Sequence, residues 1–265
     1  MAVLKQQGVS QNFSLFATTT SGSSRLATSG LPVGGAFSKS GAPIVSFQSP
    51  NNIPIKDDWR VRISLSQNSK IFYKDPSNAM MSPLRETDGV IFPYTPSITV
   101  THQAIYSPQT LTHSNYSPLS FQNSDISDIN ITGEFTVQYA SEGQYLLAAI
   151  YFFRSATKMF FGNQARNQGY SGNPPPLVFL DGYGSHYFPH VTCVVSSFQH
   201  QMPQDVDYIE VPVPGSTMTT RLPTSSSITL TVKPVYSRKN LHENFGLSDF
   251  AAGRLLGGAA SGGFL

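Results

Sequence analysis

The stretch from Ser141 to Gly162 reads SEGQYLLAAIYFFRSATKMFFG, and it is the one long segment of this chain that predicts a helix. Ser141 is a suitable N-cap, and Gln144 stands three residues later, where it completes a capping box. Glu142 falls in the first turn, where a negative charge complements the helix dipole. Gly162 stands where a C′ glycine ends a helix. We therefore expect a helix over about 142–161.

This helix is apolar on nearly all sides, so it must be covered on more than one face. Its uninterrupted apolar run, Tyr145 to Phe153, is about half of what a bilayer span needs, so we expect no membrane partner. We expect a core helix that packs on its own sheets with one face and meets an adjacent subunit with another. The residues expected to do this are Tyr145, Leu146, Ile150, Phe152, Phe153 and Phe160.

Segments on both sides of the helix read as strands. In the stretch 59–66, Trp59, Val61, Ile63 and Leu65 alternate with polar residues, which predicts a half-buried strand, and 70–73 reads as its partner. The stretch 129–139 alternates most clearly, and Gly133 on its apolar face indicates a bulge or a close approach. Further strands are expected within 90–102, 177–188, 190–202, 207–214, 217–223 and 227–238. About nine strands around one helix predict a β-rich α+β fold in which two antiparallel sheets pack together and one helix flanks them.

The chain divides into three regions by composition. Residues 1–54 are rich in Ser and Gly, and this N-terminal arm is either a segment that folds against a partner or a flexible tail. Residues 55–238 carry the β domain. Residues 239–265 form a Gly/Ala-rich extension with a short helix near 247–256, capped by Ser248. The first residues show no secretory pattern, so we expect a protein that stays in the cytosol or in something assembled there.

Residues 103–128 form a polar stretch that we expect to be a long excursion between strands. It is rich in Ser, Gln, Asn and Tyr, and Ile105-Tyr106-Ser107-Pro108 is echoed by Asn115-Tyr116-Ser117-Pro118. Long excursions inside a domain are usually functional or bound to a partner.

Composition excludes several classes of function. Charged residues make up only 12% of the 265 residues, about half the usual share. The formal net charge of +2 is too small to indicate a nucleic-acid or anionic membrane partner, and no basic stripe appears. The single cysteine, Cys193, excludes an internal disulfide framework, and we expect it to be a small buried apolar residue.

No residue pattern predicts an enzyme, a cofactor or a metal. The sequence has no nucleophile elbow, Walker loop or dinucleotide fingerprint. His186 and His190 share a strand face but would lie over about 10 Å apart. Asp181, Ser185 and His186 are triad residue types, but their closeness in sequence gives no support, because triads are built from separated segments.

Paired acids also carry no chemistry that we can assign. Asp57 and Asp58, and Asp125 and Asp128, read as solvated turn residues. The stretch 122–130 contains two of these acids, but no Gly or Glu has the spacing of a calcium loop.

The order of these segments resembles the tail-tube fold of contractile-tail bacteriophages, and is most similar to the baseplate tube-initiator or tube-cap proteins of T-even-like phages. The resemblance covers about residues 55–238. It rests on VIFPYTPSITVTHQAIYSPQTLTHSNY (90–116), on the strand-helix unit 129–162, on GNPPPLVFLDGYG (172–184) and on SITLTVKPVYSR (227–238).

The resemblance implies a structural virion protein in the phage tail, assembled in the host cytoplasm. It implies a homohexameric ring that sits on the baseplate hub, initiates the tail tube, contacts the tube subunit and lines the channel for passing DNA without reading its sequence. Neutral polar strand faces suit such a channel, because they do not hold DNA by counterion release.

Two alternatives to this reading stay open. One is the major tube subunit of the same fold. The other is a carbohydrate-binding β-sandwich, whose stacking surfaces would come from Tyr94, Tyr106, Tyr116, Tyr170 and Tyr183.

Overall fold

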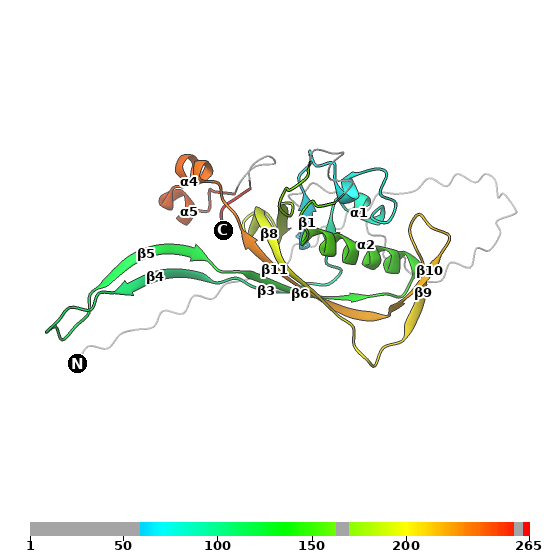
Figure 1. The fold of residues 1–265 in the computed structure, drawn as a ribbon, viewed down its shortest axis with the longest axis horizontal. Coiled ribbons are helices and arrows are strands. Elements are labelled where there is room, and N and C mark those ends of the chain that lie inside the picture. Colours follow the sequence, from blue (N-terminus) through cyan, green and yellow to red (C-terminus); the bar gives the residue numbers. More distant parts are fainter. Residues whose placement is uncertain (1–58, 163–169, 257–261) are drawn as a thin grey trace, which may run out of the picture. The chain divides into compact units, whose positions relative to one another are not determined.

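The computed structural model describes residues 59–162, 170–256 and 262–265 (Figure 1). The N-terminal arm 1–54, together with Asp57 and Asp58, lies outside the described residues. The strands are β1 (Arg62–Leu65), β2 (Val90–Ile91), β3 (Ser97–Thr99), β4 (His102–Pro108), β5 (Leu119–Ile126), β6 (Ile129–Thr136), β7 (Val178–Gly182), β8 (Phe188–Gln201), β9 (Tyr208–Pro212), β10 (Thr219–Pro223) and β11 (Ser225–Pro234). The helices are η2 (Phe72–Lys74), α1 (Pro83–Glu86), α2 (Ala140–Ala156), α4 (Arg238–Asn244) and α5 (Leu247–Ala251).

One seven-stranded sheet organises the fold. Its strand order is β2-β1-β7-β8-β11-β6-β3, and all of its pairs are antiparallel. The β-rich α+β class is therefore confirmed. The two packed sheets of the prediction are not what the described residues form, because β4–β5 and β9–β10 make separate two-stranded sheets beside the large one.

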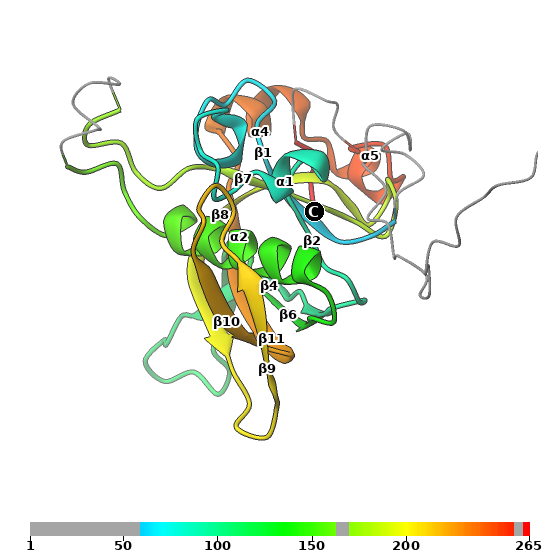
Figure 2. The ribbon, with the colours of Figure 1, turned by 90° about the vertical axis from the view of Figure 1, so that its right-hand side faces the viewer.

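The core lies between the large sheet and α2 (Figure 2). Along β6, the residues Ile129, Ile131 and Phe135 are buried and alternate with exposed ones, as the pattern predicts. On α2, the ring of Phe153 stacks on that of Phe198 in β8 at a centroid distance of 5.5 Å, and Phe152 contacts the rings of Phe72 and Tyr73 in η2 at 6.1 and 5.6 Å. The sheet thus covers one side of a helix that is apolar nearly all round.

The other side of α2 is covered by the same chain. Leu147 packs with Val211 of β9 and Leu222 of β10 in a second apolar cluster, and α1 and η2 also contact the helix. Tyr145, Leu146, Ile150, Phe152 and Phe153 are at most 6% exposed, so these five have almost no surface left for a neighbour. Only Phe160 of the expected set stays half-buried. The β9–β10 hairpin therefore covers the face of α2 that we expected an adjacent subunit to cover.

The ends of α2 differ from the prediction. Its N-cap is Tyr139, and the Glu142 carboxylate accepts the backbone N–H groups of Gln138 and Tyr139 at 2.8 and 3.4 Å, in the place expected for Gln144. The helix stops at Ala156, one turn early. The reason is that the backbone of Phe160 exchanges hydrogen bonds with the loop at Gly172 and Asn173 instead of continuing the helix.

The segment 70–73 does not pair with β1. Phe72 has a φ of +56°, and 72–74 form the short helix η2. The Tyr73 hydroxyl accepts a hydrogen bond from the backbone N–H of Leu65 at 2.7 Å. A side chain of η2 thus bonds the last residue of β1. Trp59 is exposed, and β1 is buried on both faces between β2 and β7.

Two predictions about single residues are confirmed. Cys193 on β8 is fully buried. A Cβ at Gly133 would stand 2.4 Å from the Phe92 ring, which is the close approach expected there. In the C-terminal extension a short helix exists as predicted, but it is α5, its N-cap is Gly246 in place of Ser248, and α4 precedes it.

Candidate assembly surface

The stretch 103–128 is not an irregular excursion but mostly a long hairpin, His102–Ile126. Strands β4 and β5 pair along it, with a register shift between Ile105 and Tyr106. The hairpin tip, residues 109–118, is closed at its base by the Gln109 N–H donating to the Pro118 carbonyl at 2.8 Å. In Figure 1 the two strands run side by side away from β3 and β6.

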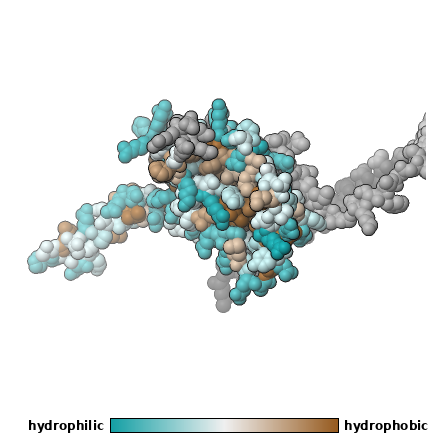
Figure 3. All heavy atoms as spheres, turned by 45° about the vertical axis from the view of Figure 1, so that its right-hand side comes forward, coloured by the Kyte–Doolittle hydropathy of each residue, from teal (hydrophilic) through white to brown (hydrophobic). Residues whose placement is uncertain are grey.

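Both faces of the long hairpin are exposed. Almost every residue of β4 and β5 is open to solvent, whichever way its side chain points. Large apolar side chains are among them, and Figure 3 shows hydrophobic atoms scattered along this element. They are Ile105, Tyr106, Leu111, Tyr116, Leu119 and Phe121, and Tyr116 in the tip is 87% exposed.

The long hairpin also lacks charge. No Lys, Arg, Asp or Glu occurs from His102 to Ser124. Exposed strands in soluble proteins usually carry charges that prevent edge-to-edge association. A two-stranded hairpin without further cover is marginally stable in water. These properties make the long hairpin a candidate interaction surface.

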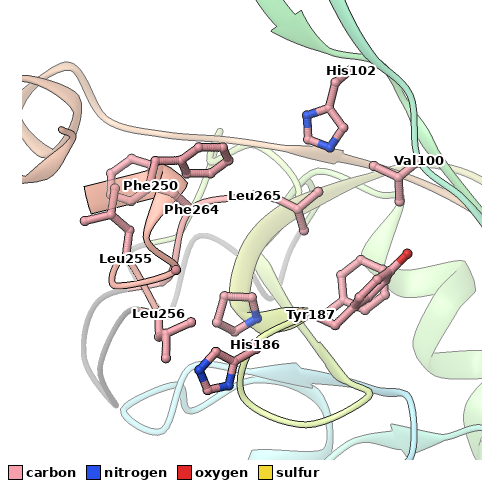
Figure 4. A pocket seen from close by; sticks show the side chains of 12 residues that line it. Val100, His102, His186, Tyr187, Phe250, Leu255, Leu256, Phe264 and Leu265 are labelled. Atoms are coloured by element: carbon pink, nitrogen blue, oxygen red, sulfur yellow. The ribbon is translucent and has the colours of Figure 1, made fainter. Parts of the chain in front are cut away.

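A pocket of about 300 Å³ lies beside the base of the long hairpin. Figure 4 shows its wall, which comes from the start of β4, from the residues around the start of β8 and from the C-terminal extension. Most lining residues are apolar in type, and His102, His186 and Tyr187 bring polar groups to the wall. The apolar residues are Val100, Phe188, Pro189, Phe250, Leu255, Leu256, Phe264 and Leu265.

The C-terminal residues reach this pocket through backbone hydrogen bonds. The Gly263 N–H donates to the Pro189 carbonyl at 2.9 Å, and the Phe264 N–H donates to the Leu255 carbonyl at 3.1 Å. The Phe264 ring stacks on Tyr236 at 5.1 Å. One wall of the pocket is therefore fixed by the extension that the sequence analysis left without a role.

The candidate catalytic residues separate into two unrelated pairs. Asp181 on β7 holds His190, whose Nδ1 lies 3.0 Å from the carboxylate, and also pairs with Arg62 at 3.5 Å. Ser185 lies 3.0 Å from Nδ1 of His186. The His190 ring stacks on Phe179 at 4.1 Å. The structure thus brings Asp181 to a histidine other than the one in the triad considered from sequence.

The histidines and acids do not gather for a metal. Within the described ranges, no group of three or more His, Cys, Asp or Glu side chains could hold an ion. Asp125 makes a distant ion pair with Lys233, at 3.9 Å.

The tyrosines considered for carbohydrate stacking lie on separate elements. Tyr94 bonds Thr136 at 2.9 Å, and the Tyr183 hydroxyl donates to the Pro96 carbonyl at 3.4 Å. Tyr106 and Tyr116 belong to the long hairpin, and Tyr170 packs on Phe160. These positions do not form one stacking platform.

A polar hollow lies near the C-terminal end of α2. Its lining includes Arg154, Lys158 and His200. Burial, with a contribution from the positive charge of Arg154, lowers the pKa of His200 below its usual value. The His200 Nε2 is buried without a hydrogen-bond partner among the described residues.

Over β6 and β11, the sheet face that points away from α2 carries mainly hydroxyl and amide side chains. Thr132 of β6 and Thr229 of β11 approach at 3.2 Å, and the Thr231 hydroxyl donates to Asn130 at 3.0 Å. Glu134 of β6 and Lys233 of β11 are the charged side chains that these two strands place on this face.

Comparisons with known proteins add no relative. No family model matches the chain, and no curated protein matches it. Among the described helices, none is long and apolar enough to cross a membrane.

The pattern of residues 103–128 marks a functional stretch but does not predict its two strands, because they carry no apolar/polar alternation. Two signals were present, namely the lack of charge from 102 to 124 and the repeated Tyr-Ser-Pro. The first copy, 106–108, ends β4, and the second, 116–118, ends the tip directly before β5. The pocket had no local signal, because its walls come from three distant segments.

Proposed function

We propose that this protein is a structural subunit of a phage-like contractile tail, where copies form a ring at the junction of baseplate and tube and initiate the tube. The long hairpin is the observation that carries the proposal. It is uncharged from 102 to 124, exposed on both faces and studded with large apolar residues. Such an element is stable when a neighbouring subunit covers it.

The face that β6 and β11 turn away from the core supports the second part of the proposal, because Lys233 is the one cation that these two strands place there. Hydroxyl and amide side chains of β6 and β11 dominate there. A channel lined by such a face lets DNA pass, because it offers few cations that could replace the counterions of the phosphates. The family resemblance over 55–238 supplies the identity of the assembly.

A role as the repeating tube subunit is the second candidate, since the same hairpin would serve it equally well. Copy number separates the two roles. An initiator ring contributes six copies to each tail, and a tube subunit contributes many multiples of six.

Quantitative mass spectrometry of tailed particles, purified from cells that produce this chain, tests the proposal. We expect the chain in the particles at about six copies per tail, in keeping with closed ring symmetry. Many multiples of six would assign it to the tube. Its absence from the particles would contradict a structural role in the tail.

A further inference from the structure

We propose that the tip of the long hairpin of one copy inserts Tyr116 into the apolar pocket beside the hairpin base of the next copy. This inference rests on the proposed function, because it names the contact that would join neighbouring copies in the proposed ring. Two surfaces of the same chain carry it, and each lacks a partner that the other supplies.

The hairpin tip exposes large apolar side chains that could enter a pocket lined mostly by apolar residues. Tyr116 is 87% exposed, and Leu111 and Leu119 beside it are more than half exposed. The tip carries no formal charge, so burying it desolvates no ion. Tyrosine is also among the residues that most often anchor interfaces, because a large ring brings one polar end.

The pocket matches this side chain in size and in polarity. Its volume of about 300 Å³ lies at the small end of the range for ligand pockets, which suits one or two large side chains. Its lining residues are mostly apolar in type, and His102, His186 and Tyr187 add polar groups. An imidazole can donate to or accept from a phenol hydroxyl, so these two histidines can satisfy the Tyr116 hydroxyl when it is buried.

A hairpin tip cannot reach the pocket of its own chain, because Val100 and His102 place that pocket at the hairpin base. From His102 to the tip the strand runs about ten residues, or roughly 30 Å at the usual rise per residue. That reach is comparable with the diameter of a small domain. One copy can therefore meet the equivalent pocket of a neighbour packed against it.

Such a contact is heterologous, since tip and pocket are different surfaces. Repeating it generates a ring when the rotation closes and an open filament when it does not. The contact thus accounts for a ring without any further interface.

A photo-crosslinker placed at the tip tests this contact in the full chain. Tyr116→p-benzoylphenylalanine keeps an aromatic side chain at a position that the fold does not bury. Irradiation of the concentrated protein is expected to give cross-linked chains, with peptides mapped to the pocket segments around His186, Leu256 and Phe264. The same label at Tyr208, a comparably exposed tyrosine on β9, is the matched control and should give no pocket cross-link.

A second variant tests the pocket. His186→Asp adds a carboxylate at an exposed position of an apolar wall, so the chain should fold normally while the cross-link yield falls by about tenfold or more. Unchanged yield with His186→Asp, or cross-links that map away from the pocket, would overturn the inference.

The number of chains in the cross-linked ladder distinguishes the tip-to-pocket contact from the proposed hexameric ring. A ladder that ends at six chains supports both. A ladder that continues beyond six keeps the tip-to-pocket contact and contradicts the hexameric ring. Rings seen by electron microscopy together with no tip cross-link at any concentration would keep the ring and overturn the contact.

Discussion

At the scale of the residue, burial decides the chemistry of the one cysteine. Cys193 lies on β8 with no exposed surface, and burial raises the pKa of its thiol to about 12. The protonated thiol is therefore favoured by the folded state. A group whose pKa rises on folding contributes stability that is complete below its ordinary pKa, near 9, and is lost as the pH rises toward 12.

We predict that Cys193→Ala lowers the stability at neutral pH but flattens its alkaline dependence. Alanine leaves a small cavity, which should cost about 1 kcal/mol. Between about pH 9 and 11 the wild type should lose stability faster than the variant, because only the wild type has a thiol to ionise. Urea unfolding at several pH values measures this, and parallel curves for the two proteins would contradict it.

Gly133 and Phe92 show what single residues can reveal from sequence. A glycine on the apolar face of an alternating strand predicted a close approach, and the Phe92 ring occupies the space that a Cβ would take. The identity of that neighbour could not be predicted, because Phe92 lies over forty residues earlier in the chain. The strand pattern therefore predicts that a neighbour approaches the backbone at Gly133, and only the tertiary structure shows that this neighbour is Phe92.

At the scale of the element, α2 was predictable in type but not in its limits or its cover. Its apolar run and first-turn Glu142 made the helix certain, whereas its end depended on the loop at 170–173 that captures Phe160. The cover from β9–β10 is also non-local, since Leu147 meets Val211 and Leu222 across more than sixty residues.

We predict that Phe152→Ala destabilises the fold by about 3–5 kcal/mol, because it removes a fully buried ring that contacts Phe72, Tyr73 and Phe153. Tyr151→Ala, at the adjacent and 41% exposed position, is the matched control and should cost less than about 1 kcal/mol. Chemical denaturation measures both values. Similar costs for the two variants would show that α2 does not face the core as described.

The long hairpin is an element whose strands could not be predicted from the sequence. Strand prediction depends on alternation, and alternation arises when one face is buried and the other is wet. Both faces of β4 and β5 are exposed within this chain, so no such pattern developed. The absence of charge, which is unusual for an exposed edge, was the more informative signal.

In the molecule as a whole, α2 gives no support for assembly, and the surface that does is the long hairpin. The helix first indicated a neighbour because it is apolar on nearly all sides, but its own chain covers it. Among the described residues, exposed large apolar side chains gather along the long hairpin, whereas others, such as Trp59, Phe161 and Leu247, lie at separate places on the surface. The proposed assembly through the hairpin tip and the pocket would leave the core of each chain independent of its neighbours.

This independence has a consequence for how subunits fold and assemble. The core cluster joins the large sheet to α2 without the long hairpin, so a single chain can hold its fold before it meets another copy. The contact proposed for the hairpin would therefore form and break without unfolding the chain.

Native mass spectrometry of the concentrated protein tests whether copies of this chain assemble in a ring through the long hairpin. We expect a species of six times the chain mass of 28.8 kDa, and we expect Tyr116→Lys to abolish it. A chain that remains at one or two chain masses at every concentration would contradict the proposed ring.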